Sequence, residues 1–190
     1  MKIPAVLFGF LVAAAATSTA AAEFMLTSPA FKDGGVMAKK HGGNVPGNAN
    51  CVGENVSPAL SWTPPPDGTK SLALVMVDPE GLSGLGVVHW VAYDIAPATN
   101  GFAEGEVSKP SDKYVGGKGT RGEPIYLGPC PTAGSGPHHY AFTLIATDLE
   151  PGALKPGLTR DELLAALKGH AKMATGLVGL YAHSSYKPAQ

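Results

Sequence analysis

Two continuous apolar runs of strand length constrain the fold more than any other feature of this sequence. They read SLALVMVD over Ser71–Asp78 and VVHWVAYDI over Val87–Ile95. Such runs, the second rich in β-branched and aromatic residues, are typical of central strands that are buried on both faces of a sheet. A third segment, His139–Asp148, alternates well enough to be another strand. We therefore expect a sheet with three long strands at its centre.

Shorter strands and one helix complete the predicted elements. Phe24–Thr27 and Ala59–Trp62 are short strand candidates. A helix is predicted over Thr159–Met173, because Thr159 and Glu162 have the spacing of a capping box. Its apolar stripe consists of Leu163, Leu164, Leu167 and Met173.

Composition indicates one mainly β domain. The chain has 25 glycines and 17 prolines in 190 residues, which favours many short elements joined by turns. Its hydrophobic content of 44% is enough for one core. Neither an internal repeat nor a linker divides the chain, so residues 23–190 are predicted to form a single domain.

The N-terminal segment has the pattern of a secretory signal. Residues 1–22, MKIPAVLFGFLVAAAATSTAAA, contain one basic residue, an apolar run and a small-residue end. A retained membrane anchor is the alternative, but Pro4 and Gly9 interrupt the apolar run. Cleavage after Ala22 would give a periplasmic or secreted protein of bacterial type, with no stable membrane insertion afterwards.

The sequence disfavours three classes of function. The formal net charge is −1 with acids and bases interspersed, so we expect no nucleic-acid partner. Gly117, Gly119 and Gly122 match the dinucleotide-binding pattern, but Glu123-Pro124 follows where a helix should begin. Neither Ser83 nor Ser135 lies in a G-x-S-x-G motif, which disfavours a serine hydrolase.

The sequence is compatible with two states of its two cysteines. In an oxidising compartment Cys51 and Cys130 can form a disulfide that closes a long loop. They can equally be two small buried thiols, because geometry alone decides whether they meet. Their spacing makes no zinc motif.

Polar residues at the ends of the strong strands form the candidate site. Asp78 ends the first run, His89 lies within the second, and His138 begins the third after the glycine- and proline-rich stretch GPCPTAGSGP. Asp78 can instead cap an Asx-type turn, and His89 can be a core histidine with a satisfied hydrogen bond. Alternation places His139 on the opposite face from His138. If the strand ends converge, they and the loop amides form a cup suited to an oxyanion.

The order of motifs resembles a known family. The segments SPALSW, LALVMVDPE, VHWVAYDI, YLGPCPTAG, HHYAFTLIATDLEPG and TGLVGLY are similar to those of the phosphatidylethanolamine-binding protein (PEBP) family, specifically its bacterial Raf-kinase-inhibitor-like branch. The resemblance extends from Phe24 to Tyr181. It implies a large central antiparallel sheet packed on a smaller sheet, with a C-terminal helix and a small anion pocket at one edge.

The resemblance also implies a set of ligand-binding residues. These are Asp78, Pro79, His89, Gly128, Pro129, Cys130, Pro131, His138 and Tyr140. Four positions depart from the family pattern, because Glu80 replaces an aspartate, Gly81-Leu82 replaces Ala-Pro, and Thr132 replaces a proline. These departures affect the rim of the expected pocket.

Two functions of different class follow. The first is a non-enzymatic binding protein without a cofactor, which holds a phosphate-, carboxylate- or phospholipid-headgroup-like ligand or inhibits a partner enzyme. The second is a hydrolase in which Asp78, His89 and His138 bind a metal or act as general acid and base. The first is preferred, because the sequence offers no separate nucleophile.

Overall fold

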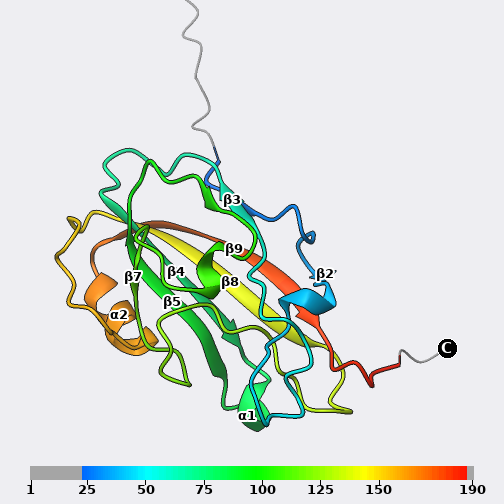
Figure 1. Cartoon of the computed structure of the whole chain (residues 1–190). Coiled ribbons are helices and arrows are strands. Elements are labelled where there is room, and N and C mark those ends of the chain that lie inside the picture. Colours follow the sequence, from blue (N-terminus) through cyan, green and yellow to red (C-terminus); the bar gives the residue numbers. More distant parts are fainter. Residues whose placement is uncertain (1–22, 188–190) are drawn as a thin grey trace, which may run out of the picture.

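A six-stranded sheet forms the centre of the molecule (Figure 1). The computed structural model describes residues 23–187, so the predicted signal at residues 1–22 lies outside the described part. The strand order is β2-β9-β8-β4-β5-β7, and every neighbouring pair is antiparallel except β2 and β9. Its strands are β2 (Gly35–Val36), β4 (Ser71–Asp78), β5 (Val87–Ile95), β7 (Val115–Gly116), β8 (His138–Thr147) and β9 (Ala171–Tyr181). The three expected central strands are thus confirmed within a residue at each end.

A smaller antiparallel sheet packs on one face of the large one. It has the order β1-β3-β6, formed by Leu26–Thr27, Leu60–Trp62 and Gly101–Phe102. Phe102 of this sheet contacts Trp90 of β5 edge-to-face, with 5.6 Å between the ring centroids, and this contact joins the two sheets. Within the small sheet, Trp62 packs against Phe102 with 5.4 Å between the ring centroids. The mainly β fold with a large and a small sheet is confirmed.

The central strands are apolar throughout because both faces of the large sheet are covered. Leu72, Leu74 and Met76 of β4 face the small sheet, whereas Ala73 and Val75 belong to a second apolar cluster on the opposite face. That second cluster includes Leu163 and Leu167 of helix α2 (Arg160–Leu167). A strand covered on both sides loses the polar alternation of a half-exposed strand, which explains the run SLALVMVD.

The predicted C-terminal helix is shorter than expected, and a strand follows it. The capping box is present, since Thr159 Oγ1 accepts from the Glu162 amide and the Glu162 carboxylate accepts from the Thr159 amide. The helix ends at Leu167 because Gly169 takes a left-handed φ of 86°, and Met173 is an exposed residue of β9. The expectation of a helix to Met173 was therefore wrong. The C-terminal position belongs to β9, which pairs with β8 along its length.

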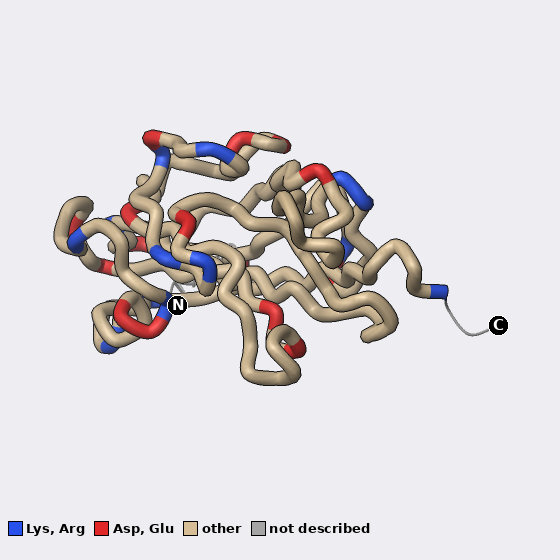
Figure 2. Tube along the Cα trace, turned by 60° about the horizontal axis from the view of Figure 1, so that its bottom comes forward, with Lys and Arg blue, Asp and Glu red and all other residues tan. Residues whose placement is uncertain are grey.

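Short turns and surface loops complete the fold. The single turns are η1 (Lys39–His41), α1 (Gly81–Gly84) and η2 (Glu106–Ser108). Leu82 and Ser83 within α1 have φ of 51° and 59°, so α1 is a left-handed turn rather than a regular helix. Figure 2 shows acidic and basic residues interspersed along the surface loops. Within residues 23–187 no helix has both the length and the apolar character to cross a membrane.

Candidate functional site

A cavity of about 610 Å³ lies at the end of the large sheet where β4 ends and β5 and β8 begin. Its walls come from four segments that are distant in sequence: residues 43–55, the β4–β5 connection, residues 120–135 and the start of β8. Five of the nine expected ligand-binding residues line it: Asp78, His89, Gly128, Cys130 and His138. Pro79, Pro129, Pro131 and Tyr140 are not among the lining residues.

Antiparallel pairing of β4 and β8 brings Asp78 and His138 together. Asp78 Oδ2 accepts from His138 Nδ1 at 2.8 Å, and both residues are buried. Asp78 Oδ1 also accepts from the amides of Glu80 and Gly81 at 2.9 Å. The Asx-type turn and the site role are therefore not alternatives, because one carboxylate fulfils both. Asp78 fixes the hydrogen of His138 on Nδ1, and Nε2, on the cavity side, makes no hydrogen bond to any residue of 23–187.

His89 reaches the same cavity through a β-bulge. Met76 of β4 pairs with Trp90 and Val77 pairs with Val88, so His89 has no partner across the strand pair. An extra residue of this kind turns the side chain toward the face of its neighbour, here that of Trp90. The ring donates from Nδ1 to the Leu127 carbonyl at 2.8 Å. Burial lowers the pKa of His89 although the Leu127 carbonyl and the Asp78 charge oppose the shift. His89 is therefore a neutral ring at neutral pH.

Tyr140 lies behind the two histidines rather than in the cavity wall. Its ring centroid is 5.2 Å from that of His89 and 6.5 Å from that of His138. Burial and the charge of Asp78 raise the pKa of Tyr140 far above its ordinary value, so the hydroxyl stays neutral. That hydroxyl is fully buried and has no hydrogen-bond partner within residues 23–187. Tyr140 supports the positions of both rings through its packing.

The glycine- and proline-rich loop offers fewer amides to a ligand than the sequence suggested. The Gly128 amide donates to Asn55 Oδ1 at 2.8 Å, and Pro129 and Pro131 have no N–H. Asn55 itself adopts a φ of 56° and donates from Nδ2 to the Tyr126 carbonyl at 3.3 Å. Of residues 128–131, only Cys130 keeps an amide that the described hydrogen bonds do not use. Within Gly128–Pro131, the expected loop amides are thus reduced to that of Cys130, whereas Thr132, Gly134 and Gly136 of the same loop also keep amides that no described hydrogen bond uses.

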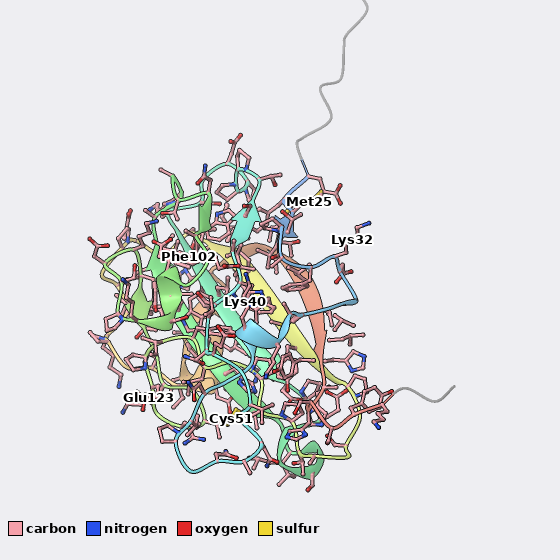
Figure 3. All side chains as sticks on the ribbon, turned by 45° about the vertical axis from the view of Figure 1, so that its right-hand side comes forward. Met25, Lys32, Lys40, Cys51, Phe102 and Glu123 are labelled. Carbon is pink, nitrogen blue, oxygen red and sulfur yellow. A yellow bond between two sulfur atoms is a disulfide. The ribbon has the colours of Figure 1, made fainter. Side chains whose placement is uncertain are left out.

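A disulfide between Cys51 and Cys130 joins two walls of the cavity. The two Cα atoms are 4.5 Å apart, within the range that a disulfide spans. Of the two readings left open by the sequence, the bridge is the one that the structure shows. It ties the loop that contains Cys51 to the loop after Leu127, and Figure 3 shows Cys51 at the end of the molecule where α1 lies.

Comparison with known proteins identifies the family. Residues 27–182 match the sequence profile described as phosphatidylethanolamine-binding protein. The chain belongs to this family. A UPF0098 protein of Methanothermobacter thermautotrophicus is 39% identical over 141 residues, which cover 73% of this chain and 91% of that protein.

Two further PEBP-family comparisons cover most of both chains. LppC of Mycobacterium tuberculosis, whose name describes it as a candidate lipoprotein, is 36% identical over 167 residues, with 85% of this chain and 76% of LppC covered. The crystal structure of the PEBP homologue CT736 from Chlamydia trachomatis superposes with a TM-score of 0.72 at 32% identity. That superposition covers 85% of this chain and 98% of CT736.

Sequence reasoning missed polar residues of this PEBP-family cavity that lie in loops. Arg121 is exposed at the wall and takes part in no ion pair among the described residues. Asn48, Asn50 and Asn55 also line the cavity. Arg121 belongs to the GKGTRG loop, which was rejected as a nucleotide motif, and no local pattern indicates that this loop reaches the cavity. For the asparagines, the sequence offers only their density around Cys51 as an indication.

The residues that could hold a metal differ from the expected trio. Asp78, Glu80 and His138 each offer one ligand atom, and these atoms lie within 4.8 Å of one another, but His89 is not in the group. Both Glu80 oxygens already accept from His139, one from the backbone amide at 3.1 Å and one from Nδ1 at 2.8 Å. Both Asp78 oxygens are also engaged. A metal here would have to displace these hydrogen bonds.

Proposed function

We propose that this protein is an exported, non-enzymatic binding protein whose cavity holds a small oxyanion, such as phosphate, a carboxylate or a phospholipid headgroup. The observation that carries the proposal is the pair of buried imidazoles in one cavity. Each has Nδ1 bound to the protein, His138 to Asp78 and His89 to Leu127, and each leaves Nε2 for a ligand. Rings fixed in this way are preorganised, so a ligand loses little affinity to ordering them.

Charge at the cavity also supports an anion. When the His138 ring is protonated, Asp78 balances the charge on the Nδ1 side and Nε2–H can donate to the ligand. Arg121 adds an exposed guanidinium at the wall, where it can attract an anion over a longer distance. The Cys130 amide offers one further donor from the loop.

Binding is favoured over hydrolysis because the cavity lacks an arranged nucleophile. An Asp–His pair acts as a base when a hydroxyl or thiol hydrogen-bonds the far nitrogen of the ring. Within residues 23–187, no serine, threonine or cysteine side chain makes that bond to Nε2 of His138 or His89. Metal analysis of protein purified without chelator tests the hydrolase alternative, which a stoichiometric transition metal would favour.

Calorimetric titration of phosphate tests the proposal. We expect His138→Ala to lose a charge-assisted hydrogen bond and about 1.5 to 3 kcal/mol of affinity. His139→Ala is the matched control, because His139 is the next residue but points to solvent. Equal losses in the two variants, or no phosphate binding by the parent, would contradict the proposal.

Export is supported by two observations and one prediction. Disulfides persist in oxidising compartments, and Cys51–Cys130 is such a bond. LppC, one of the relatives, carries a lipoprotein name. Residues 1–22 have the pattern of a secretory signal. We therefore propose a location in the periplasm or outside the cell. Intact mass of the exported protein should match a chain that begins near Glu23, and a full-length mass would refute this.

A further inference from the structure

The two cavity histidines differ in what they can offer a ligand. His89 donates from Nδ1 to the Leu127 carbonyl, so its hydrogen is committed to the protein. In a neutral imidazole with its hydrogen on Nδ1, Nε2 is a hydrogen-bond acceptor. His89 is only 7% exposed, and Nε2 makes no hydrogen bond within the described residues. His89 therefore presents a lone pair, not a donor, to whatever fills the cavity.

The surroundings of His89 keep it in that form. Burial disfavours the imidazolium and lowers its pKa, and the nearby His138 acts in the same direction. The Leu127 carbonyl, the Asp78 carboxylate and the Gly128 backbone act in the opposite direction but do not reverse the shift. Tyr140, the other titratable group in contact with the ring, remains a neutral phenol. Protonating His89 to serve an anion would require a charge in this buried position.

His138 can donate a hydrogen bond from Nε2 to a ligand, whereas His89 cannot. Its Nδ1 lies 2.8 Å from a buried carboxylate oxygen, so its imidazolium form has a counter-ion within the protein. In that form Nε2–H donates. The cavity thus combines one donor and one acceptor from two adjacent strands. An oxyanion without a hydrogen would satisfy His138 but would place its own lone pairs against the lone pair of His89.

We propose that this pocket selects oxyanions that carry their own hydrogen, such as a monoprotonated phosphate or phosphate monoester, and rejects fully deprotonated analogues of the same shape and charge. This inference rests on the proposed anion-binding function. The ligand P–OH would donate to His89 Nε2 while an anionic oxygen accepts from His138 Nε2. A buried acceptor that is left unpaired by the wrong ligand makes such a site selective. Free phosphate, a soluble monoester and a lipid phosphate monoester share this chemistry.

Methyl phosphate and methyl sulfate form a matched pair of probes. At pH 5.5 both are monoanions with one methyl group and a tetrahedral centre. Methyl phosphate retains a hydrogen because the second pKa of a phosphate monoester is about 6, whereas methyl sulfate has none. We expect calorimetry to show at least about tenfold tighter binding of methyl phosphate, from the cost of an unpaired buried acceptor. Equal binding would overturn the selectivity alone, whereas binding of neither would overturn the anion-binding function itself.

Variants assign the selectivity to a residue. In His89→Ala the ratio of the two dissociation constants should fall to within about twofold, because the selective acceptor is gone. In His138→Ala both probes should bind more weakly while the ratio stays above about fivefold, because the selective acceptor is retained. His139→Ala should change neither quantity. Selectivity that survives in folded His89→Ala would contradict the inference.

A measurement on the parent protein guards against a variant that does not fold. Long-range proton–nitrogen NMR distinguishes a protonated from an unprotonated imidazole nitrogen. His89 Nε2 should be unprotonated at neutral pH, and at pH 5.5 its resonance should shift when methyl phosphate is added. A protonated Nε2 at His89 would overturn the inference.

Vesicle binding separates a lipid source of the ligand from a soluble source. The protein is mixed with phosphatidylcholine vesicles, with and without phosphatidic acid. Cosedimentation only with phosphatidic acid indicates a lipid monoester, and binding of methyl phosphate alone indicates a soluble one.

Discussion

Two adjacent histidines at the start of β8 make the same hydrogen bond in opposite surroundings. His138 Nδ1 is 2.8 Å from an Asp78 oxygen, and His139 Nδ1 is 2.8 Å from a Glu80 oxygen. The side chains of the first pair are 10% and 4% exposed, whereas those of the second are 56% and 41% exposed. Strand alternation alone separates them, because successive residues point to opposite faces. The degree of burial, and not the distance between Nδ1 and the carboxylate oxygen, therefore decides how much such a pair contributes to stability.

The largest expected difference is in stability. Asp78→Ala should reduce the free energy of unfolding by about 3 to 5 kcal/mol, because it removes one partner of a buried pair and leaves two backbone amides without an acceptor. Glu80→Ala should cost less than about 1 kcal/mol, since exposed pairs contribute little. Urea unfolding of both variants measures the difference. Similar losses in the two would mean that the contrast in burial has no energetic consequence.

A destabilised variant remote from the cavity separates stability from binding. Leu163 of α2 is fully buried in the apolar cluster on the other face of the sheet. Leu163→Ala should therefore cost about 2 to 5 kcal/mol. Its phosphate affinity should equal that of the parent once the folded fraction is taken into account. A matching loss of affinity would show that effects seen at Asp78 and His138 come from stability and not from contact with the ligand.

The acid sensitivity of the fold should depend on His89 more than on the exposed histidine. The pKa of His89 is lowered in the folded state, so below pH 6.5 the unfolded chain binds a proton that the folded chain does not. Stability should then fall by about 1.4 kcal/mol per pH unit from pH 6.5 down to the folded pKa. His89→Gln should remove this slope and His139→Gln should keep it. Parallel pH profiles for the parent and His89→Gln, measured by chemical unfolding, would refute the assignment.

The smallest effect is expected from the exposed pair at low pH. Partial burial tends to raise the pKa of Glu80, but hydrogen bonds from the His139 amide and ring outweigh it and lower the pKa below 4.5. The resulting stabilisation is present above pH 4.5 and is lost as the pH falls through the folded-state pKa. Because the pair is exposed, Glu80→Gln should change stability at neutral pH by less than about 1 kcal/mol, and by nothing measurable at pH 3. A larger loss in thermal unfolding would contradict this ranking.

Sequence patterns predicted the parts of the site that depend on local periodicity. The long apolar runs identified β4, β5 and β8, and alternation along β8 correctly separated His138 from His139. Strict alternation along β5 would have placed His89 with Val91 and Tyr93 on the face covered by α2. The β-bulge directs His89 to the other face of the sheet. It depends on how β5 pairs with β4, and this pairing cannot be predicted from the local sequence. His89 was a candidate because it is a polar residue within an apolar strand and because the family resemblance includes it, but periodicity alone would not have directed it into the cavity.

Long-range contacts account for what the sequence did not predict. The Gly128 amide donates to the side chain of Asn55, which is 73 residues away in the sequence. The loop therefore has fewer free hydrogen-bond donors than its own sequence suggested. β9 was missed because its first five residues lack a strand-like pattern and two glycines interrupt the rest. One of these, Gly179, is required because a Cβ there would overlap Met37 of the adjacent segment. Pairing with β8, rather than intrinsic propensity, makes this segment a strand.

A crystal structure of the phosphate complex would show directly whether the two buried imidazoles bind the anion. One phosphate should occupy the cavity, with different oxygens within hydrogen-bond distance of His89 Nε2 and His138 Nε2 and with His139 still paired to Glu80. Phosphate held only by Arg121 at the surface, or a cavity that stays free of phosphate in crystals grown with it, would contradict the claim that the two buried imidazoles form an anion site.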